Sequence, residues 1–172
     1  MRVEIRRIRA DEGPLLMQVR LLSLLDAPYA FGGTYIDSIQ RPADHWKARA
    51  EAASVGGDSA IFLAHGPDGV VGMAGAFQAE DRDESRQIFG VWVEPMFRRQ
   101  GLARRLVETV IAWAETAGAD ESELWANETN VPAVGLYRSL GFEDTGDRQP
   151  LASDAAVTEM KLVRPAGRGP SV

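Results

Sequence analysis

The stretch 87–114 constrains the fold of this chain more than any other. Residues 87–93 are rich in β-branched and aromatic side chains, which predicts a buried strand. Pro95 ends this strand, because proline has no N–H to donate to a sheet ladder. Apolar residues then recur at helical spacing from 102 to 114. The pattern therefore predicts a strand, a short basic loop and the N-terminus of a helix.

The loop between these two elements suits an anionic ligand. The first backbone N–H groups of a helix have no intrahelical partner, and the helix dipole adds positive potential there. Gly101 and Ala103 are small, so a bulky anion such as a pyrophosphate can approach the backbone. The loop has neither the Gly-Lys-Ser/Thr of a P-loop nor the Gly-x-Gly-x-x-Gly of a dinucleotide fold. An ordinary strand-to-helix turn with surface arginines is the alternative.

Composition narrows the function. A chain of 172 residues, 45% of them hydrophobic, is long enough for one domain with a sizeable core. It has no cysteine and only two histidines, so we expect neither thiol chemistry nor a metal centre. A net charge of -6 disfavours general binding of nucleic acid. Because no apolar run reaches membrane-spanning length and the N-terminus resembles no signal peptide, we expect a cytoplasmic protein with no membrane partner.

The rest of the chain is predicted to alternate between strands and helices. Turn signals place an antiparallel hairpin over 59–79, and we interpret the charged run 80–84 as its solvated tip. Segments 3–8, 123–126, 142–144 and 159–163 are the other expected strands, and 11–25, 42–53 and 131–140 the other expected helices. We expect a single domain over 1–164 and a disordered tail over 165–172.

Two motifs resemble the GNAT superfamily of acyl-CoA-dependent N-acetyltransferases. The first is RRQGLA at 98–103, which meets the family's acyl-CoA loop pattern Gln/Arg-x-x-Gly-x-Gly/Ala. The second is NVPAVGLYRSLGF at 130–142, which is similar to the family's later Asn-to-Tyr helix signature. They occur in the family's order, and the resemblance covers about residues 59–164.

The resemblance implies an α/β (α+β) GNAT fold: a single mixed, mostly antiparallel sheet of six to seven strands with helices on both faces. Its central parallel pair, 87–93 and 123–126, splays into a V that holds acetyl-CoA. Pantetheine would pair with the strand as an added strand, and the pyrophosphate would rest on the N–H groups of 99–103. The implied cofactor-binding residues are Val91, Trp92, Val93, Arg98, Arg99, Gln100, Gly101, Leu102, Ala103 and Asn130. Asn130 has a helix cap as its alternative role.

The implied reaction is transfer of an acetyl group to a primary amine of a small molecule or peptide, by direct attack in a ternary complex. An amine with a pKa of about 10.4 is almost fully protonated near pH 7, so deprotonation needs help. A backbone N–H near Val93 is expected to stabilise the oxyanion. Tyr137 occupies the position of the family's general acid. Glu94 is our first choice of general base, with Glu80 and Asp81, acting through water, as alternatives.

No pattern in the sequence identifies the amine acceptor. We expect it to contact loops 26–41 and 143–157, where Tyr29 and Phe31 either pack inward or line a pocket, as does Trp46 on the next helix. A non-catalytic acyl-CoA-binding or sensing domain is the alternative function. A nucleotide-binding α/β domain is disfavoured by the antiparallel strands that precede the loop. The resemblance also allows a homodimer.

Overall fold

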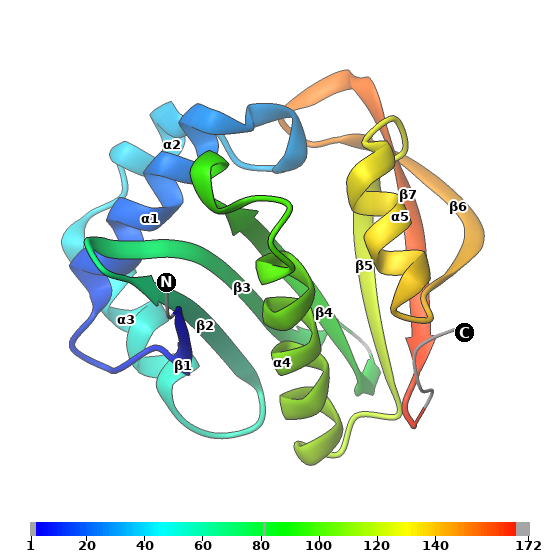
Figure 1. The fold of residues 1–172 in the computed structure, drawn as a ribbon, viewed down its shortest axis with the longest axis horizontal. Coiled ribbons are helices and arrows are strands. Elements are labelled where there is room, and N and C mark those ends of the chain that lie inside the picture. Colours follow the sequence, from blue (N-terminus) through cyan, green and yellow to red (C-terminus); the bar gives the residue numbers. More distant parts are fainter. Residues whose placement is uncertain (1–2, 81, 168–172) are drawn as a thin grey trace.

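The computed structural model describes residues 3–80 and 82–167, which form one seven-stranded mixed sheet flanked by helices (Figure 1). The strands are β1 Glu4–Arg7, β2 Ser59–Gly66, β3 Gly69–Ala79, β4 Arg82–Val93, β5 Glu121–Asn127, β6 Glu143–Leu151 and β7 Asp154–Pro165. The helices are α1 Gly13–Asp26, α2 Tyr35–Ile39, α3 Ala43–Ser54, α4 Leu102–Thr116 and α5 Val131–Ser139, with short 3-10 turns η1 Pro28–Ala30 and η2 Pro95–Phe97.

The sheet has the order β1-β2-β3-β4-β5-β7-β6, and only β4 and β5 run parallel. These two strands pair only where residues 85–87 face residues 121–123, and beyond that point they separate (Figure 1). The predicted fold class, with its splayed parallel pair, is therefore confirmed. None of the helices in the described ranges combines the length and apolar character needed to cross a membrane.

Both faces of the sheet are covered, and β2 shows why. Ala60, Phe62 and Ala64 join the hydrophobic cluster that α4 and α5 contribute to. Ile61 and Leu63 join the second cluster, to which α1 and α3 contribute. Successive side chains of a strand point to opposite faces, so a strand buried on both sides needs an unbroken apolar run.

Strand β4 begins at Arg82, five residues before the predicted start, and the charged run is therefore only partly a solvated tip. Arg86 is only 5% exposed. Its guanidinium donates to the carbonyl oxygens of Gly57 (3.0 Å) and Asp83 (2.7 Å). A buried charge is tolerated when it is hydrogen-bonded, and those partners come from distant or irregular segments that hydropathy does not reveal.

The first residues of the expected tail are held by hydrogen bonds. Strand β7 runs through Pro165, and the N–H of Ala166 donates to the carbonyl of Asp120 (2.7 Å). The N–H of Gly167 donates to the carboxylate of Glu115 (3.1 Å). The expectation of disorder therefore applies only to 168–172, which lie outside the described residues.

Candidate active site

The V between β4 and β5 holds two adjoining cavities. The outer one, of about 580 Å³, opens over the start of α4, and the inner one, of about 80 Å³, lies deeper between the strands. Four residues line both: Ala30, Phe31, Val91 and Asn130. Of the predicted cofactor-binding residues, those that line the cavities are Val91, Trp92, Val93, Arg98, Arg99, Gly101, Leu102, Ala103 and Asn130.

A bulge in β4 shapes the open edge of this strand. Gly75 of β3 faces Phe89 and Met73 faces Trp92, so β4 has two residues opposite one residue of β3. Gly90 adopts φ 65° at this point, a conformation that other residues rarely adopt. A Cβ on Gly90 would lie 2.8 Å from the terminal methyl of Met73, a flexible side chain that can shift, so the backbone conformation is the main reason for glycine here.

The main chain of β4 beyond the bulge faces the V. The N–H of Glu94 donates to the carbonyl of Val71 (2.9 Å), so the backbone N–H of Glu94 faces β3. Alternation along the strand then directs the backbone groups of Val91 and Val93 to the opposite edge. The guanidinium of Arg98 reaches the Val93 carbonyl at that edge (2.8 Å). The amides of Val91 and Val93 therefore face the space in which an extended ligand would lie.

The loop before α4 presents backbone N–H groups without partners. The N–H of Arg98 donates to Pro95 (3.3 Å), and that of Arg105 donates to Gly101 (3.1 Å). Between them, at residues 99–104, no backbone N–H has a hydrogen-bond partner in the described part of the chain. Gly101 has φ 77° and leaves open space where a side chain would begin. This is the geometry of an anion site at a helix N-terminus.

The four arginines around this loop have different surroundings. Arg99 and Arg104 line the outer cavity, and Arg104 also donates to Ser139 Oγ (2.6 Å). Arg98 lines it as well but pairs with Asp26. Arg105 donates to the carbonyl of Val3 (3.1 Å) and points away, as expected for one of four arginines around a helix start. Arg104 also pairs with Glu108 (3.3 Å), so of the three arginines that line the cavity only Arg99 has no ion pair in the described part of the chain.

Asp26 is a link that the sequence analysis missed. Its carboxylate accepts a hydrogen bond from Trp92 Nε1 (2.9 Å) and pairs with Arg98. It thereby joins the end of α1 to both β4 and the basic loop. A helix-ending Asp carries no pattern that would identify such a role, because its partners are 66 and 72 residues away in sequence.

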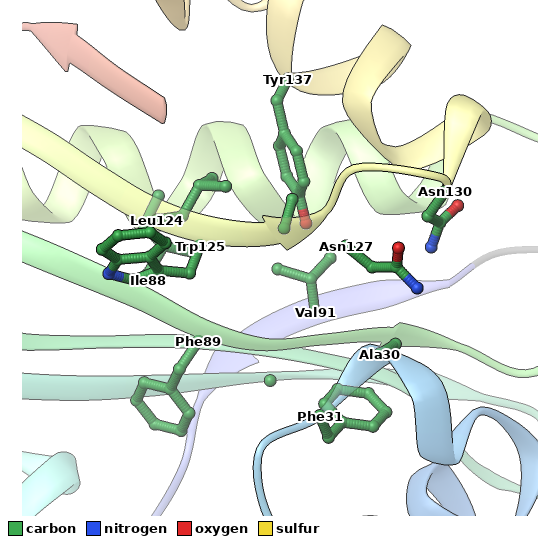
Figure 2. A pocket seen from close by; sticks show the side chains of 12 residues that line it. Ala30, Phe31, Ile88, Phe89, Val91, Leu124, Trp125, Asn127, Asn130 and Tyr137 are labelled. Atoms are coloured by element: carbon green, nitrogen blue, oxygen red, sulfur yellow. The ribbon is translucent and has the colours of Figure 1, made fainter. Parts of the chain in front are cut away.

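Tyr137 lies at the inner cavity. Figure 2 shows its ring extending from α5 toward the space between β5 and β4, with the hydroxyl near Val91. The side chain is 8% exposed and packs edge-on against Phe142. The hydroxyl has no hydrogen-bond partner among the described residues, and burial raises the pKa of Tyr137 to about 12. The phenol therefore stays protonated throughout the neutral range, ready to donate to a ligand.

The loop between β5 and α5 closes one end of the inner cavity (Figure 2). Asn130 caps α5 by accepting a hydrogen bond from the N–H of Ala133 (3.4 Å). Asn127, whose importance the sequence did not reveal, accepts from the Thr129 N–H (3.0 Å) and hydroxyl (2.8 Å). Its amide also donates to the Tyr29 carbonyl (3.5 Å) across the mouth of the V. Both asparagines thus have structural partners while their side chains line the cavity.

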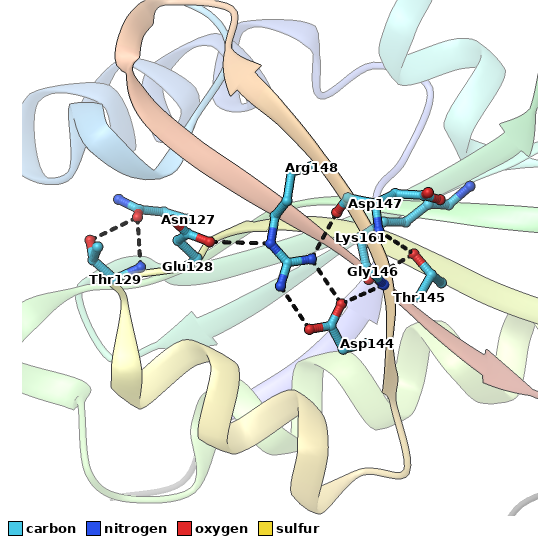
Figure 3. Close-up of polar contacts among 9 residues, drawn as sticks. All are labelled: Asn127, Glu128, Thr129, Asp144, Thr145, Gly146, Asp147, Arg148 and Lys161. Carbon is cyan, nitrogen blue, oxygen red and sulfur yellow. Dashed lines mark hydrogen bonds and ion pairs between the residues drawn. The ribbon is translucent and has the colours of Figure 1, made fainter.

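A salt-bridge network fixes this loop to the end of the sheet (Figure 3). Arg148 of β6 pairs with Glu128, next to Asn127, at 3.2 Å. The same guanidinium pairs with Asp144 at 2.8 Å, and its hydrogen bond lowers the pKa of that carboxyl to about 2. The network joins β6 to the cavity loop.

The two segments predicted as acceptor loops meet at the cavity, but neither is a loop throughout. The segment 26–41 contains η1 and α2, and 143–157 contains β6 and the start of β7. Ser153, in the turn between β6 and β7, donates to the Phe31 carbonyl (2.8 Å). Tyr29 is 51% exposed and lines the outer cavity, whereas Phe31 is buried and lines both. Trp46 is 3% exposed and packs in the α1–α3 core, so of the two roles considered for it the structure shows packing.

No lining residue is a candidate general base. The lining residues of both cavities include no Asp, Glu or His. Glu94 is partly buried but lines neither cavity, so the structure does not bring it together with Tyr137. Glu80 is exposed at the end of β3, and Asp81 lies outside the described residues. Gln100 also lines neither cavity, and its side chain donates to the Met96 carbonyl (3.2 Å).

The charged side chains form no evident metal centre. Within 3–80 and 82–167, no three His, Cys, Asp or Glu side chains come close enough to hold an ion.

Known proteins resemble this chain in sequence and in fold. A family model described as acetyltransferase (GNAT) family matches residues 22–142. Human N-acetyltransferase 8 is 37% identical over 91 residues, which cover 51% of this chain and 40% of that protein. The match therefore spans less than half the length of this curated relative.

Two solved structures share the fold. An acetyltransferase of the GNAT family from Streptococcus pneumoniae superposes with a TM-score of 0.81 at 18% identity, covering 96% of this chain and all (100%) of that one. A putative acetyltransferase from Salmonella typhimurium, solved with its cofactor acetyl-CoA, superposes with a TM-score of 0.79 at 17% identity. The second match covers 100% of this chain and 98% of the other.

Proposed function

This chain belongs to the acetyltransferase (GNAT) family, and we propose that it transfers an acetyl group from acetyl-CoA to a primary amine of a small molecule or peptide. One observation carries the proposal. The partnerless N–H groups of 99–104 and the open backbone edge of β4 line one continuous site, which ends at Tyr137. A diphosphate, an extended chain and a thioester follow one another in acetyl-CoA in the same order.

The donor is held mainly by main-chain groups. The pyrophosphate accepts hydrogen bonds from the N–H groups of 99–104, where the dipole of α4 adds to the charges of Arg99 and Arg104. The pantetheine arm lies along the edge of β4 and pairs with the amides of Val91 and Val93. This pairing occupies the gap that β5 leaves and brings the thioester to the inner cavity.

The reaction then needs three groups at the thioester. The neutral amine attacks the carbonyl carbon, and a β4 amide, that of Val91 or Val93, donates to the oxyanion. The C–S bond breaks as the oxyanion collapses, and CoA leaves as a thiolate. Tyr137 donates a hydrogen bond to the departing sulfur. We propose direct attack in a ternary complex, because the lining residues include no nucleophilic Ser, Thr or Lys.

The pKa of Tyr137 defines how it acts. With a pKa of about 12 in the empty site, the phenol is a much weaker acid than a thiol of pKa about 8.5. Complete proton transfer to the sulfur would be uphill by roughly 5 kcal/mol. We therefore propose that Tyr137 chiefly stabilises the thiolate as a hydrogen-bond donor, and that solvent completes the protonation.

The amine loses its proton without a lining carboxylate. Apolar side chains such as Ile88 and Leu124 form part of the wall of the inner cavity, beside polar side chains such as Asn127 (Figure 2). The apolar part of this wall disfavours the ammonium form and so favours binding of the free amine. We propose that water carries the proton to solvent, with Glu94 or Glu80 acting only at a distance.

The organisation of the chain stays a prediction in two respects. We propose that residues 1–164 act as one domain and that the protein works in the cytoplasm. A homodimer is compatible with the family, and sedimentation velocity on the purified chain tests it.

The decisive experiment measures donor binding and turnover separately. Calorimetry should show acetyl-CoA binding where ATP and NAD do not bind, and a thiol-detecting assay should show CoA release with members of an amine panel. Binding without transfer to any amine would favour the acyl-CoA-sensing alternative. Failure to bind acetyl-CoA at all would overturn the proposal.

A further inference from the structure

Two arginines lie behind the aromatic rings on the acceptor side of the V. Arg20 of α1 places its guanidinium carbon 4.7 Å from the ring centroid of Phe31, and Arg49 of α3 places its own 5.4 Å from that of Phe89. Both rings line the inner cavity, together with Tyr137. A single aromatic ring therefore lies between each guanidinium and the inner cavity, where acetyl transfer is proposed to occur.

Neither guanidinium has a carboxylate partner. Arg20 Nη1 is buried without any hydrogen bond, and no ion pair or side-chain hydrogen bond of Arg20 or Arg49 occurs among the described residues. Burial, together with the neighbouring charge of Arg49, lowers the pKa of Arg20 to about 10. Burial and the charge of Arg41 likewise lower the pKa of Arg49. The electrostatic neighbours of this pair are thus cations.

Other arginines with little exposure do find partners, and Arg7 and Arg86 donate to backbone carbonyls. Arg6, Arg98 and Arg148 each bind a carboxylate at close range. The chain has 25 acidic against 19 basic residues, so carboxylates are abundant. A guanidinium that is buried stays protonated and is costly to leave unpaired. A half-buried arginine and an exposed one, both without a carboxylate partner and both stacked on rings that line a cavity, are the arrangement expected for a site whose counter-ion arrives with the ligand.

The pair is accessible to a small anion. Arg49 is exposed, so one side of the cluster opens to solvent. Arg20 is half-buried with its Nη1 enclosed, and a Cβ on Gly33 would lie 3.4 Å from its Nη2, so an anion would reach the pair from the side of Arg49. Phe31, whose ring covers Arg20, belongs to the loop that Ser153 holds against the cavity.

We propose that Arg20 and Arg49 form a subsite for the carboxylate of the acceptor, and that the acceptor is a small α-amino acid carrying its amine and carboxylate on one short scaffold. The proposal rests on the acetyltransferase activity proposed above and adds the class of its substrate. Two guanidinium groups offer a carboxylate several charge-assisted hydrogen bonds. With the carboxylate held there, the amine is directed past the rings toward the thioester.

The test compares α-amino acids with their α-amides as acceptors. We expect wild-type protein to favour the amino acids, after correction for the fraction of neutral amine. Arg20→Gln and Arg49→Gln should lower kcat/KM for amino acids about 10- to 100-fold, the range of lost charged hydrogen bonds, and for amides less than about threefold. Arg9→Gln, at an exposed arginine outside the site, is the control. Equal losses on both classes, or a preference for amides, would overturn the subsite.

A binding measurement keeps the two proposals distinguishable. The same pairs are titrated by calorimetry into protein saturated with CoA. Binding of the amino acid but not of the amide, lost in Arg20→Gln, supports the subsite even without turnover. Equal binding of both members of each pair, or no binding of either, contradicts it even where acetyl-CoA binds and amines are acetylated. Arg20→Met should also raise the melting temperature, since it removes an unpaired buried charge, and a fall would count against the unpaired state.

Discussion

The two sides of the V present different kinds of groups to a ligand. On the proposed donor side, backbone N–H groups at 99–104 and the open edge of β4 are the groups available for contact. On the acceptor side, the walls are side chains from segments far apart in sequence, such as Phe31, Phe89 and Trp125. One side depends on the path of the backbone, and the other on the identity of the residues that the fold brings together.

The difference has a chemical reason. Acetyl-CoA presents a diphosphate and amide groups, which backbone amides can bind with little dependence on the side chains. An acceptor differs from other amines only in its own substituents, so its selection requires particular side chains. Enzymes with different sequences can therefore bind acetyl-CoA in the same way. The side chains on the acceptor side determine which amine each enzyme selects.

The largest expected effect on turnover comes from Tyr137, at the inner cavity where the donor and acceptor sides meet. Tyr137→Phe should lower turnover by about 10²- to 10³-fold, since it removes the donor to the departing sulfur. Acetyl-CoA affinity and stability should change little, because the hydroxyl has no partner among the described residues and the ring packing is kept. Steady-state kinetics and calorimetry measure these effects. Full turnover in this variant would remove Tyr137 from the mechanism.

The acceptor side predicts a characteristic pH dependence. With no titratable base lining the site, kcat/KM for the acceptor should rise about tenfold per pH unit from pH 6 to pH 8, following the free amine. Tyr137, with its pKa raised to about 12, should not lose its proton in this range. Rates measured with two acceptors of different amine pKa check this. A shared plateau near pH 6 would reveal a base that the cavity lining does not show.

The donor side is tested by a charge in the anion site. Gly101→Asp should weaken acetyl-CoA binding by roughly 30-fold, since a carboxylate would face the diphosphate. Gly118→Asp is the matched control, because both glycines have positive φ (77° and 86°) and open space at the Cβ position. Both variants should be destabilised by about 1 kcal/mol from backbone strain. Calorimetry measures the acetyl-CoA affinity of both variants. Equal losses in Gly101→Asp and Gly118→Asp would argue against a diphosphate at Gly101.

The smallest expected effect concerns the link between the two sides. Asp26→Asn keeps an oxygen for Trp92 but removes the charge that pairs with Arg98, and both side chains are partly exposed. We expect a loss of about 1 kcal/mol in stability and about threefold in acetyl-CoA affinity. Glu51→Gln, in the exposed Lys47 pair, is the control and should cost less. Urea denaturation measures both losses of stability. Equal losses in Asp26→Asn and Glu51→Gln would contradict a stabilising role for the Asp26–Arg98 pair.

The sequence predicted the secondary-structure elements of the donor side well and the arrangement of the acceptor side poorly. Strand, glycine loop and helix at 82–116 are consecutive, so local patterns were sufficient to place them. The bulge at Gly90 was not predicted, although a lone glycine within a strand is a signal for one. Phe31 and Ser153 lie 122 residues apart, and no local pattern joins them.

The choice of Glu94 as general base shows most clearly what local sequence patterns fail to predict. Its place at the end of the central strand suggested a catalytic base, yet it lines neither cavity. The backbone position was correct, but the direction of a side chain at a strand end depends on the turn that follows and on the neighbouring strand. The cationic pair Arg20 and Arg49 was missed for the same reason, because absence of a partner is a three-dimensional property.

The amino-acid sequence by itself determined the order of the main strands and helices other than α2, the glycine-containing turn before α4, and the family to which its motifs point. These features arise from backbone preferences and hydrophobic periodicity, which act over a few residues. Tertiary structure alone decided which side chains line the V, that Asp26 joins α1 to the basic loop, and that two arginines remain unpaired behind aromatic rings. Those features depend on burial and charge at contacts between distant segments, and only the folded chain brings such segments together.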